Sequence, residues 1–416
     1  MARNKLPKNS RSAPSRRETR PLSALLSQIL VAFTVELDNQ FERLMNEAGH
    51  TGGRLSLVVW SNLIRFVLDD SITIRELAAQ SLAEQTAIKF QLGCLERWGF
   101  VVLNERAKTG GIPEARGRHE AVGGLRDGWG SGRGLSGNWT VRLTAKGAKT
   151  KEIWPPLFDA IEERWRQRFG DDEIKDLRDA LQAIVAQIDI ELPHGLMNVW
   201  QRKQPFPARL TKEVSELSLP ALFSQVLVAF AMEFERESPA PLWLCANTIR
   251  VLGEQPIRQS EIARLTGSSP ETSGSGWQLK PYIVVESGRA TGRGKLIRLS
   301  ARGLEVQKNY HQLALAIEKR WEQRFGKDPT RALRAALESI LDAEQGESLL
   351  LAEGLVPPNG TVRAGDTAPA LGRRDVGSAA KQRARHLVAQ TESFVSDPAA
   401  ALPHYPLWDM NRGFGP

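Results

Sequence analysis

The chain of 416 residues has few of the residues from which disulfide frameworks and metal centres are built. It contains two cysteines, Cys94 and Cys245, far apart and each in an apolar stretch, and six histidines that lack the spacing of metal ligands. Two separated cysteines indicate no disulfide framework and favour a reducing compartment, so we expect a cytoplasmic protein. We predict no metal site and no cofactor.

Long apolar runs are also missing. No stretch reaches the roughly 18 uninterrupted apolar residues that a membrane span requires. Arg16 and Arg17 precede an apolar run at 22–35, as in a twin-arginine signal, but the same run recurs in mid-chain, where no signal can act. We therefore expect no membrane association.

Catalytic motifs are missing as well. The segment GRATGRGKL at 288–296 has its second glycine misplaced for a phosphate-binding loop and no hydroxyl residue after Lys295. GWGSGRG at 128–134 lacks the dinucleotide-binding spacing and follows no strand. With no nucleophile, acid–base pair or metal cluster in view, we expect no enzyme and assign no catalytic residue.

Positive charge is what the chain has in excess. The formal net charge is +8 and the pI about 9.6, which favours a polyanionic partner, either nucleic acid or an anionic membrane. Residues 1–20 hold seven Lys or Arg and one Glu, with almost no apolar side chain. We expect this arm to be disordered until an anion orders it, with Arg16, Arg17 and Arg20 as its DNA-contacting candidates.

The chain contains one pattern twice. Five blocks of the first half recur in the same order in the second half. The matched pairs are SQILVAFTVEL from Ser27 with SQVLVAFAMEF from Ser224, NLIR at 62–65 with NTIR at 247–250, RELA at 75–78 with SEIA at 260–263, VRLTAKG at 141–147 with IRLSARG at 297–303, and IEERWRQRFG from Ile161 with IEKRWEQRFG from Ile317. The second copy lacks residues at two places, and such places are predicted to be loops.

This duplication divides the chain into five segments. The predicted segments are a disordered basic arm at 1–20, a first domain at 21–190 with a long insertion at about 105–137, a linker at 191–218, a second domain at 219–345, and a largely disordered tail at 346–416.

Within each copy the pattern predicts four helices, two short strands, a long helix and a final helix. The predicted strand pairs are 100–103 with 139–143 and 282–285 with 296–299. The predicted caps are Thr144 and Ser300 for the long helices, Thr73 with Glu76 for the third helix, and Asp328 before Pro329 for the last one. The order predicts a mainly α fold with small β-wings, formed by two tandem winged-helix domains.

These blocks resemble the MarR family of winged helix-turn-helix transcriptional regulators of bacteria. The resemblance rests on RELA, on AIKFQLGCLERWGFV from Ala87, on LTAKG from Leu143 and on WRQRFG from Trp165, and it covers nearly all of both copies. It implies reading of double-stranded DNA, a dimerisation layer of first and last helices, and a pocket for a small aromatic or anionic effector. Since both copies lie in one chain, we expect an intramolecular pseudo-dimer associated with the bacterial nucleoid.

In the first copy, a recognition helix would turn its N-terminal side chains to the major groove. The candidates are Gln85, Thr86, Lys89 and Phe90, opposite a packing set of Ala87, Ile88, Leu92, Leu95 and Trp98. Gln85 suits an adenine edge, and Lys89 suits a guanine or a phosphate. The alternative interpretation is that these four are merely solvated positions.

Basic wing tips are the second set of candidates, because such side chains can enter the minor groove. They are Arg106, Lys108, Arg116, Arg118 and Arg133 in the first copy, and Arg289, Arg293 and Lys295 in the second. The alternative interpretation of the long first wing is a disordered loop, since acidic residues between the basic ones offset most of its positive charge. In the second copy Gly274, Gly276 and Pro281 weaken the recognition helix, so its reading of bases is in doubt.

Two further interpretations stay open. Cys94 suits a redox sensor or, more simply, inert core, and several tryptophans suit either an effector pocket or core packing. The whole chain is also compatible with a tandem winged-helix adaptor that binds other proteins, with non-specific or no DNA binding. A steep salt dependence of duplex binding would distinguish the regulator from the adaptor.

Overall fold

A computed structural model of the chain gives the fold. It describes residues 20–50, 55–67, 71–105, 135–197, 199–200, 202, 205–209, 213–266, 278–287, 295–342, 350, 354 and 402–406. The side chains of Thr86, Phe90, Ser287, Asp342 and four residues between 259 and 264 are outside this description.

The first half is mainly helical, with one short strand before its third helix and two more between its fourth and fifth helices. Its elements are α1 (Leu22–Glu47), α2 (Leu57–Asn62), the 3₁₀ turn η1 (Ile64–Phe66), β1 (Ile72–Thr73), α3 (Ile74–Gln80), α4 (Gln85–Arg97), β2 (Val101–Asn104), β3 (Thr140–Leu143), α5 (Ala145–Phe169) and α6 (Asp171–Val185).

The second half repeats this order. Its elements are α7 (Leu219–Glu237), α8 (Leu242–Leu244), the π-helical turn η2 (Cys245–Ile249), β4 (Ile257–Arg258), α9 (Gln259–Thr266), η3 (Lys280–Tyr282), β5 (Ile283–Ser287), β6 (Lys295–Leu299), α11 (Ala301–Arg324) and α12 (Lys327–Asp342). Each matched sequence block therefore lies in a corresponding element of the two halves.

Each half contains one small antiparallel sheet of three strands. The strand orders are β1-β3-β2 and β4-β6-β5, so the last strand of each half lies in the middle of its sheet. Val101 pairs with Leu143 and Ile283 with Leu299, which gives both hairpins the same register. The prediction contained the two hairpins but omitted β1 and β4, which are only two residues long.

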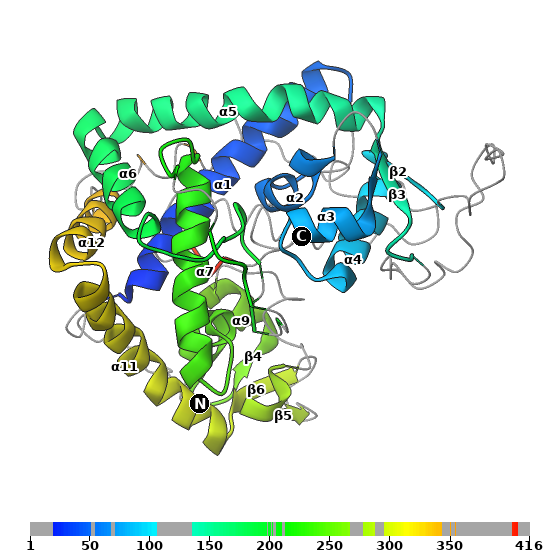
Figure 1. Cartoon of the computed structure of the whole chain (residues 1–416). Helices are drawn as coiled ribbons and strands as arrows, with labels where there is room; N and C mark the ends of the chain where they lie inside the picture. The colour runs from blue at the N-terminus through cyan, green and yellow to red at the C-terminus, as the bar shows by residue number, and fades with distance from the viewer. Residues whose placement is uncertain are drawn as a thin grey trace, which may run out of the picture.

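The first and last helices of the two halves pack on one another reciprocally. α1 packs on α7 and α12, and α6 packs on the same two helices. From this shared helix layer α5 leads to the first sheet and α11 to the second (Figure 1). The two sheets thus lie at the ends of two long helices that start from one common core.

The core continues through both halves and contains equivalent aromatic contacts. Phe33 meets Trp165 edge-on with ring centroids 5.1 Å apart, and Phe230 meets Trp321 in the same way at 5.3 Å. Trp165 and Trp321 are both fully buried. The repeated sequence therefore reproduces its packing as well as its secondary structure.

The helix starts confirm most of the predicted caps. Thr144 and Ser300 side chains accept hydrogen bonds from the backbone N–H groups of Gly147 and Gly303 (3.0 and 3.2 Å). The prediction that Asp328 caps the last helix was wrong, because α12 begins at Lys327 and includes Asp328.

Two predicted connecting segments are partly buried. In the predicted linker, Leu192, Leu196 and Phe206 are at most 6% exposed, and in the predicted tail Leu402 is 1% exposed. The described apolar residues of both segments therefore pack into the common core.

Helix α1 is long and apolar enough to cross a membrane by length and composition alone. In the structure its most apolar 18-residue window is completely buried by the rest of the protein. The central helix of a folded core has the same length and composition.

Candidate nucleic-acid interface

Helix α3 starts directly against the chain that enters β3. The Thr73 hydroxyl accepts a hydrogen bond from the Glu76 N–H (3.2 Å), and the Glu76 carboxylate accepts one from the Thr73 N–H (2.9 Å), which confirms the capping box. The N–H groups of Ile74 and Arg75 donate to the carbonyls of Trp139 and Gly137 at 2.9 and 3.0 Å. The helix is therefore fixed to the residues that lead into β3.

Helix α4 packs one face onto the core and leaves the other at the surface. Ile88, Leu92 and Leu95 are fully buried, as the predicted packing set requires. Gln85 and Lys89, one helical turn apart, are both partly exposed. The side chains of the other two candidates on this helix, Thr86 and Phe90, lie outside the described residues.

The turn between α3 and α4 has an unusual backbone and an external support. Leu82 has a φ of 56°, in the left-handed region that costs an L-residue roughly 1–2 kcal/mol. Its carbonyl accepts a hydrogen bond from the guanidinium of Arg202, which lies 3.8 Å above the Phe206 ring. A segment that the sequence suggests is a linker therefore holds this turn.

A polar edge joins α3, α4 and the residues just before β3. The Arg75 guanidinium donates to the Asn138 side-chain oxygen (3.1 Å), and the Gln85 amide oxygen lies beside Gly137 and Arg75, 3.3 Å from where a Cβ on Gly137 would stand. Sequence reasoning missed Arg75 and Asn138. The signal for Arg75 was the difference between RELA and SEIA, which places a cation on only one copy.

Most of the predicted wing residues cannot be placed. Arg106, Lys108, Arg116, Arg118, Arg133, Arg289 and Arg293 lie outside the described residues, as do Arg16 and Arg17 of the arm. Lys295 is exposed at the start of β6. The predicted recognition segment of the second copy, at 267–277, is also outside the description.

Arg20 has an internal position that differs from its predicted place on a free arm. Its guanidinium donates to the Gln28 side chain on α1 (3.0 Å), and its carbonyl accepts from Arg334 (3.2 Å). Because both contacts lie within the helix layer, Arg20 joins the halves instead of extending toward a ligand.

The tryptophans that suited an effector pocket are mainly core. Trp154, Trp165 and Trp321 are fully buried, and Trp60 stacks on Trp154 with ring centroids 5.7 Å apart. A cavity of about 240 Å³ lies elsewhere, between Trp200, Phe206 and Met232, with Glu235 and two arginines at its wall. Burial raises the pKa of the Glu235 carboxyl to about 7, against the effect of the Leu242 N–H that donates to it.

The cysteines differ in their surroundings. Cys245 is fully buried, and this burial raises the pKa of its thiol to about 12, which keeps the thiol protonated and unreactive. Cys94 is partly buried on α4 and packs against the core.

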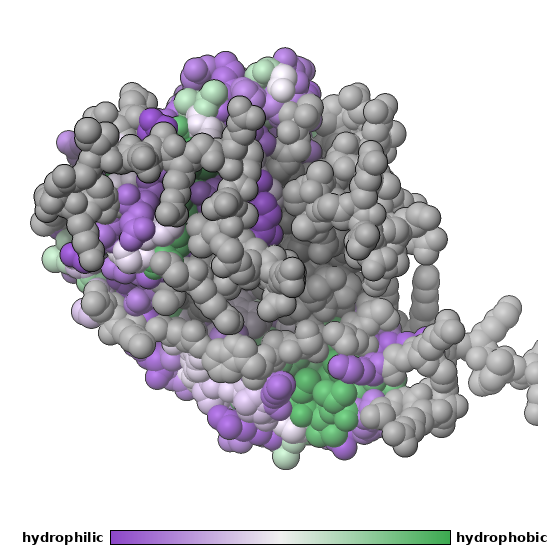
Figure 2. All heavy atoms as spheres, turned by 90° about the vertical axis from the view of Figure 1, so that its right-hand side faces the viewer, coloured by the Kyte–Doolittle hydropathy of each residue, from purple (hydrophilic) through white to green (hydrophobic). Residues whose placement is uncertain are grey.

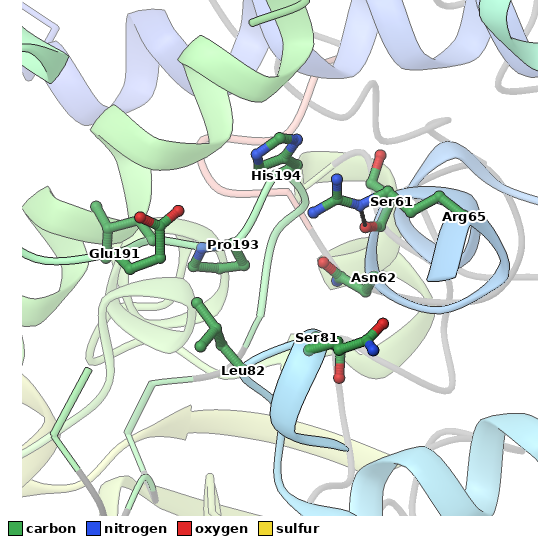
Figure 3. A pocket seen from close by; sticks show the side chains of 10 residues that line it. Ser61, Asn62, Arg65, Ser81, Leu82, Glu191, Pro193 and His194 are labelled. Atoms are coloured by element: carbon green, nitrogen blue, oxygen red, sulfur yellow. Dashed lines mark hydrogen bonds between the residues drawn. The ribbon is translucent and has the colours of Figure 1, made fainter. Parts of the chain in front are cut away.

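A second, smaller cavity of about 70 Å³ lies where the chain leaving α6 meets η1 and the α3–α4 turn. Figure 3 shows Ser61, Asn62 and Arg65 on one side of it, and Glu191, Pro193 and His194 on the other. Burial lowers the pKa of the Arg65 guanidinium to about 10, while Glu191 raises it. Burial, Arg65 and Arg209 together lower the pKa of His194 to about 4.

The partly buried His194 predicts a stability that depends on pH. Because its pKa is about 4 in the folded chain and 6.5 for a histidine in water, the unfolded chain binds more protons between these values. Stability is therefore fully present above pH 6.5 and is lost as the pH falls toward 4. Between pH 7 and 5 the free energy of unfolding should fall by roughly 2 kcal/mol through this group.

Urea unfolding of the wild type and of His194→Gln at pH 7, 6 and 5 measures this contribution. The variant should show a pH dependence shallower by roughly 2 kcal/mol, and the comparison cancels the carboxylate titrations common to both chains. Parallel curves for the two proteins would mean that His194 is protonated as easily in the folded chain as in the unfolded one.

No group of three His, Cys, Asp or Glu side chains is arranged to hold a metal ion among the residues with a described position. The candidate interface consists of α3, α4 and the polar edge beside them.

Comparisons of the chain with known protein families, with curated proteins and with solved structures find no match.

Proposed function

We propose that the protein is a transcriptional regulator that binds double-stranded DNA, with two winged-helix domains paired inside one chain. The observation that carries this proposal is the α3–turn–α4 unit followed by the β2–β3 hairpin, with Arg75 exposed on α3 and with Gln85 and Lys89 partly exposed on α4. Domains of this kind bind DNA with two packed helices, of which the second reads the bases, and with a wing beside them.

In this proposal α4 enters the major groove. Gln85 pairs with an adenine edge and Lys89 reaches a guanine or a phosphate, while Arg75 and the basic wing contact the backbone nearby. The second half supplies the paired partner through the helix layer and adds Lys295 at its wing. A small aromatic effector in the 240 Å³ cavity would act on α4 through Arg202, which lines that cavity and holds the turn.

Duplex affinity and its salt dependence test the reader helix. DNA fragments selected from a genomic pool by the wild type should bind with an affinity that falls steeply with salt. Lys89→Ala should reduce the magnitude of the log–log salt slope by about one, since one phosphate contact is lost. Gln85→Ala should reduce the preference for the selected site by about tenfold, through loss of a base contact. Fluorescence anisotropy measures both.

Lys175→Ala is the matched control, because it removes the same charge from an exposed site on α6, where Lys175 pairs with Asp179 at 2.9 Å. It should leave affinity, slope and site preference unchanged. If Lys89→Ala and Gln85→Ala behave like this control, α4 is not the DNA reader.

The adaptor is a second candidate because of an apolar patch on the second sheet. Val285 of β5 is 51% exposed, and its neighbours Ile283 and Val284 are partly exposed. Figure 2 shows an apolar patch near the lower edge of the molecule, at the height where β5 and β6 lie in Figure 1. Such a patch suits a protein partner. Failure to enrich any duplex at physiological salt would favour this function.

A further inference from the structure

Two short segments of the chain, each after the last helix of a repeat, share the tripeptide Leu-Pro-His. The first is Leu192-Pro193-His194, shortly after α6, and the second is Leu402-Pro403-His404, far beyond α12. We call 192–196 the first strap and 402–405 the second strap. Both are largely buried without belonging to a helix or a strand, and their leading leucines are each 1% exposed.

The two straps make equivalent hydrogen bonds. The carbonyl of Leu192 accepts from the Gln225 side chain (3.1 Å), and that of Leu402 accepts from Gln28 (3.3 Å), the glutamine at the matching position of the first repeat. Each glutamine is held by an arginine, Arg209 at 2.6 Å and Arg20 at 3.0 Å. The symmetry of the duplication therefore extends to the straps.

A second pair of contacts completes this correspondence. Asn62 donates to the Leu196 carbonyl (2.7 Å), and Asn247 donates to the Tyr405 carbonyl (2.9 Å). Asn247 also accepts from the Tyr405 N–H (3.1 Å). The second strap is thus bound at both backbone groups of one residue, in the manner of a recognised ligand.

Each strap crosses between the repeats. The second strap binds Ser27 and Gln28 on α1 of the first repeat through the carbonyls of Pro403 (2.9 Å) and Leu402, and it binds Asn247 of η2 in the second repeat. The first strap binds α7 of the second repeat and Asn62 of the first. Both straps therefore connect the first helix of one repeat to the second-helix region of the other.

The straps differ in how they are attached. Only residues 186–191 separate α6 from the first strap, whereas residues 343–401 separate α12 from the second strap. The longer connection lowers the effective concentration of the second strap at its groove.

We propose that the groove between α1 and η2 is a peptide-binding site for a Leu-Pro-His-Tyr segment, and that the tail segment 402–405 occupies it as a releasable clasp between the repeats. Side-chain groups of Ser27, Gln28 and Asn247 read the peptide backbone, while Leu402 and Tyr405 fill buried positions. The first strap is the permanent counterpart of this clasp. This inference does not depend on DNA binding by the protein.

The test empties the groove in the full-length chain. In Leu402→Ala/Tyr405→Ala, a labelled synthetic peptide of residues 398–410 should bind in fluorescence anisotropy at least about tenfold more tightly than it binds the wild type, whose own tail competes. A peptide with the same two alanines should not bind, and Asn247→Ala added to the emptied chain should weaken binding about tenfold. Equal binding of both peptides, or equal binding by wild type and emptied chain, would overturn the proposal.

A second variant keeps the groove native in case the emptied chain fails to fold. A specific protease site is placed after Lys381, between α12 and the second strap, and the folded full-length chain is then cleaved. The released fragment, which carries 402–405, should co-elute with the body in gel filtration at high concentration and separate on dilution. A fragment that separates at every concentration would show that the clasp has no affinity of its own.

Discussion

Arg178→Ala is expected to lower the free energy of unfolding by about 3 kcal/mol, because it leaves a buried carboxylate short of its main partner. The Glu162 side chain is 5% exposed and accepts hydrogen bonds from Nε (2.9 Å) and Nη2 of Arg178. The same guanidinium donates to the Leu217 carbonyl (2.9 Å), just before α7. The residue thus joins α5, α6 and the second repeat.

The equivalent residue of the second repeat offers a matched variant. Arg334 binds Glu318 through two bonds of 2.5 and 2.6 Å and donates to the Arg20 carbonyl, just before α1. Because Glu318 is 14% exposed, against 5% for Glu162, Arg334→Ala should cost less than Arg178→Ala. Urea unfolding followed by circular dichroism measures both.

Arg331→Ala is the control, since Arg331 is 65% exposed and its pair with Glu322 is a surface contact of about 0–1 kcal/mol. A loss for Arg178→Ala no larger than for Arg331→Ala would mean that Glu162 finds water or Arg166 as an adequate substitute.

Gly147→Ala and Gly303→Ala should each cost about 3 kcal/mol or more, through steric overlap with backbone that cannot move aside. A Cβ at Gly147 would stand 2.0 Å from the Phe100 carbonyl oxygen, and one at Gly303 would stand 2.1 Å from that of Tyr282. The same carbonyls accept the N–H groups of Thr144 (3.0 Å) and Ser300 (2.9 Å), which fix each hairpin to its long helix. An added methyl group would force the two apart.

Gly253→Ala provides the control, because a Cβ there meets no atom within 4 Å. It should change the free energy of unfolding by no more than about 0.5 kcal/mol. If Gly147→Ala unfolds at the same urea concentration as Gly253→Ala, the start of α5 can shift from β2 without loss, and the tight contact is not a constraint on the fold.

The repeat made much of the fold predictable. Blocks such as LTAKG and LSARG determine a helix start locally, because each contains a capping hydroxyl and a glycine that must approach a carbonyl. Similar sequences therefore give the same helix start twice. The strands β1 and β4 were missed because two residues have no periodicity to detect. Their pairing depends on β3 and β6, which are distant in the chain.

The candidate interface was predictable only in part. The burial of Ile88, Leu92 and Leu95 follows from helical spacing, and with it the exposed side of α4. Asn138 and the support from Arg202 come from segments outside the helix, and tertiary contacts bring them there. The aromatic residues near the end of the chain suggested that this segment could dock onto the folded body or bind a partner, but its correspondence with 192–196 was missed, since a shared tripeptide is too short to stand out.

The reciprocal packing of α1 on α12 and of α6 on α7 has a further consequence, because all four helices belong to one polypeptide. A pair of separate, identical subunits comes apart on dilution, and any substitution in it appears twice. Here the pairing is independent of the protein's concentration, and each half can change alone. The connection between β2 and β3, residues 105–139, is much longer than the one between β5 and β6, residues 288–294, while the two halves remain packed on one another. Because the halves are joined, a connection in one half can differ in length without a matching change in the other.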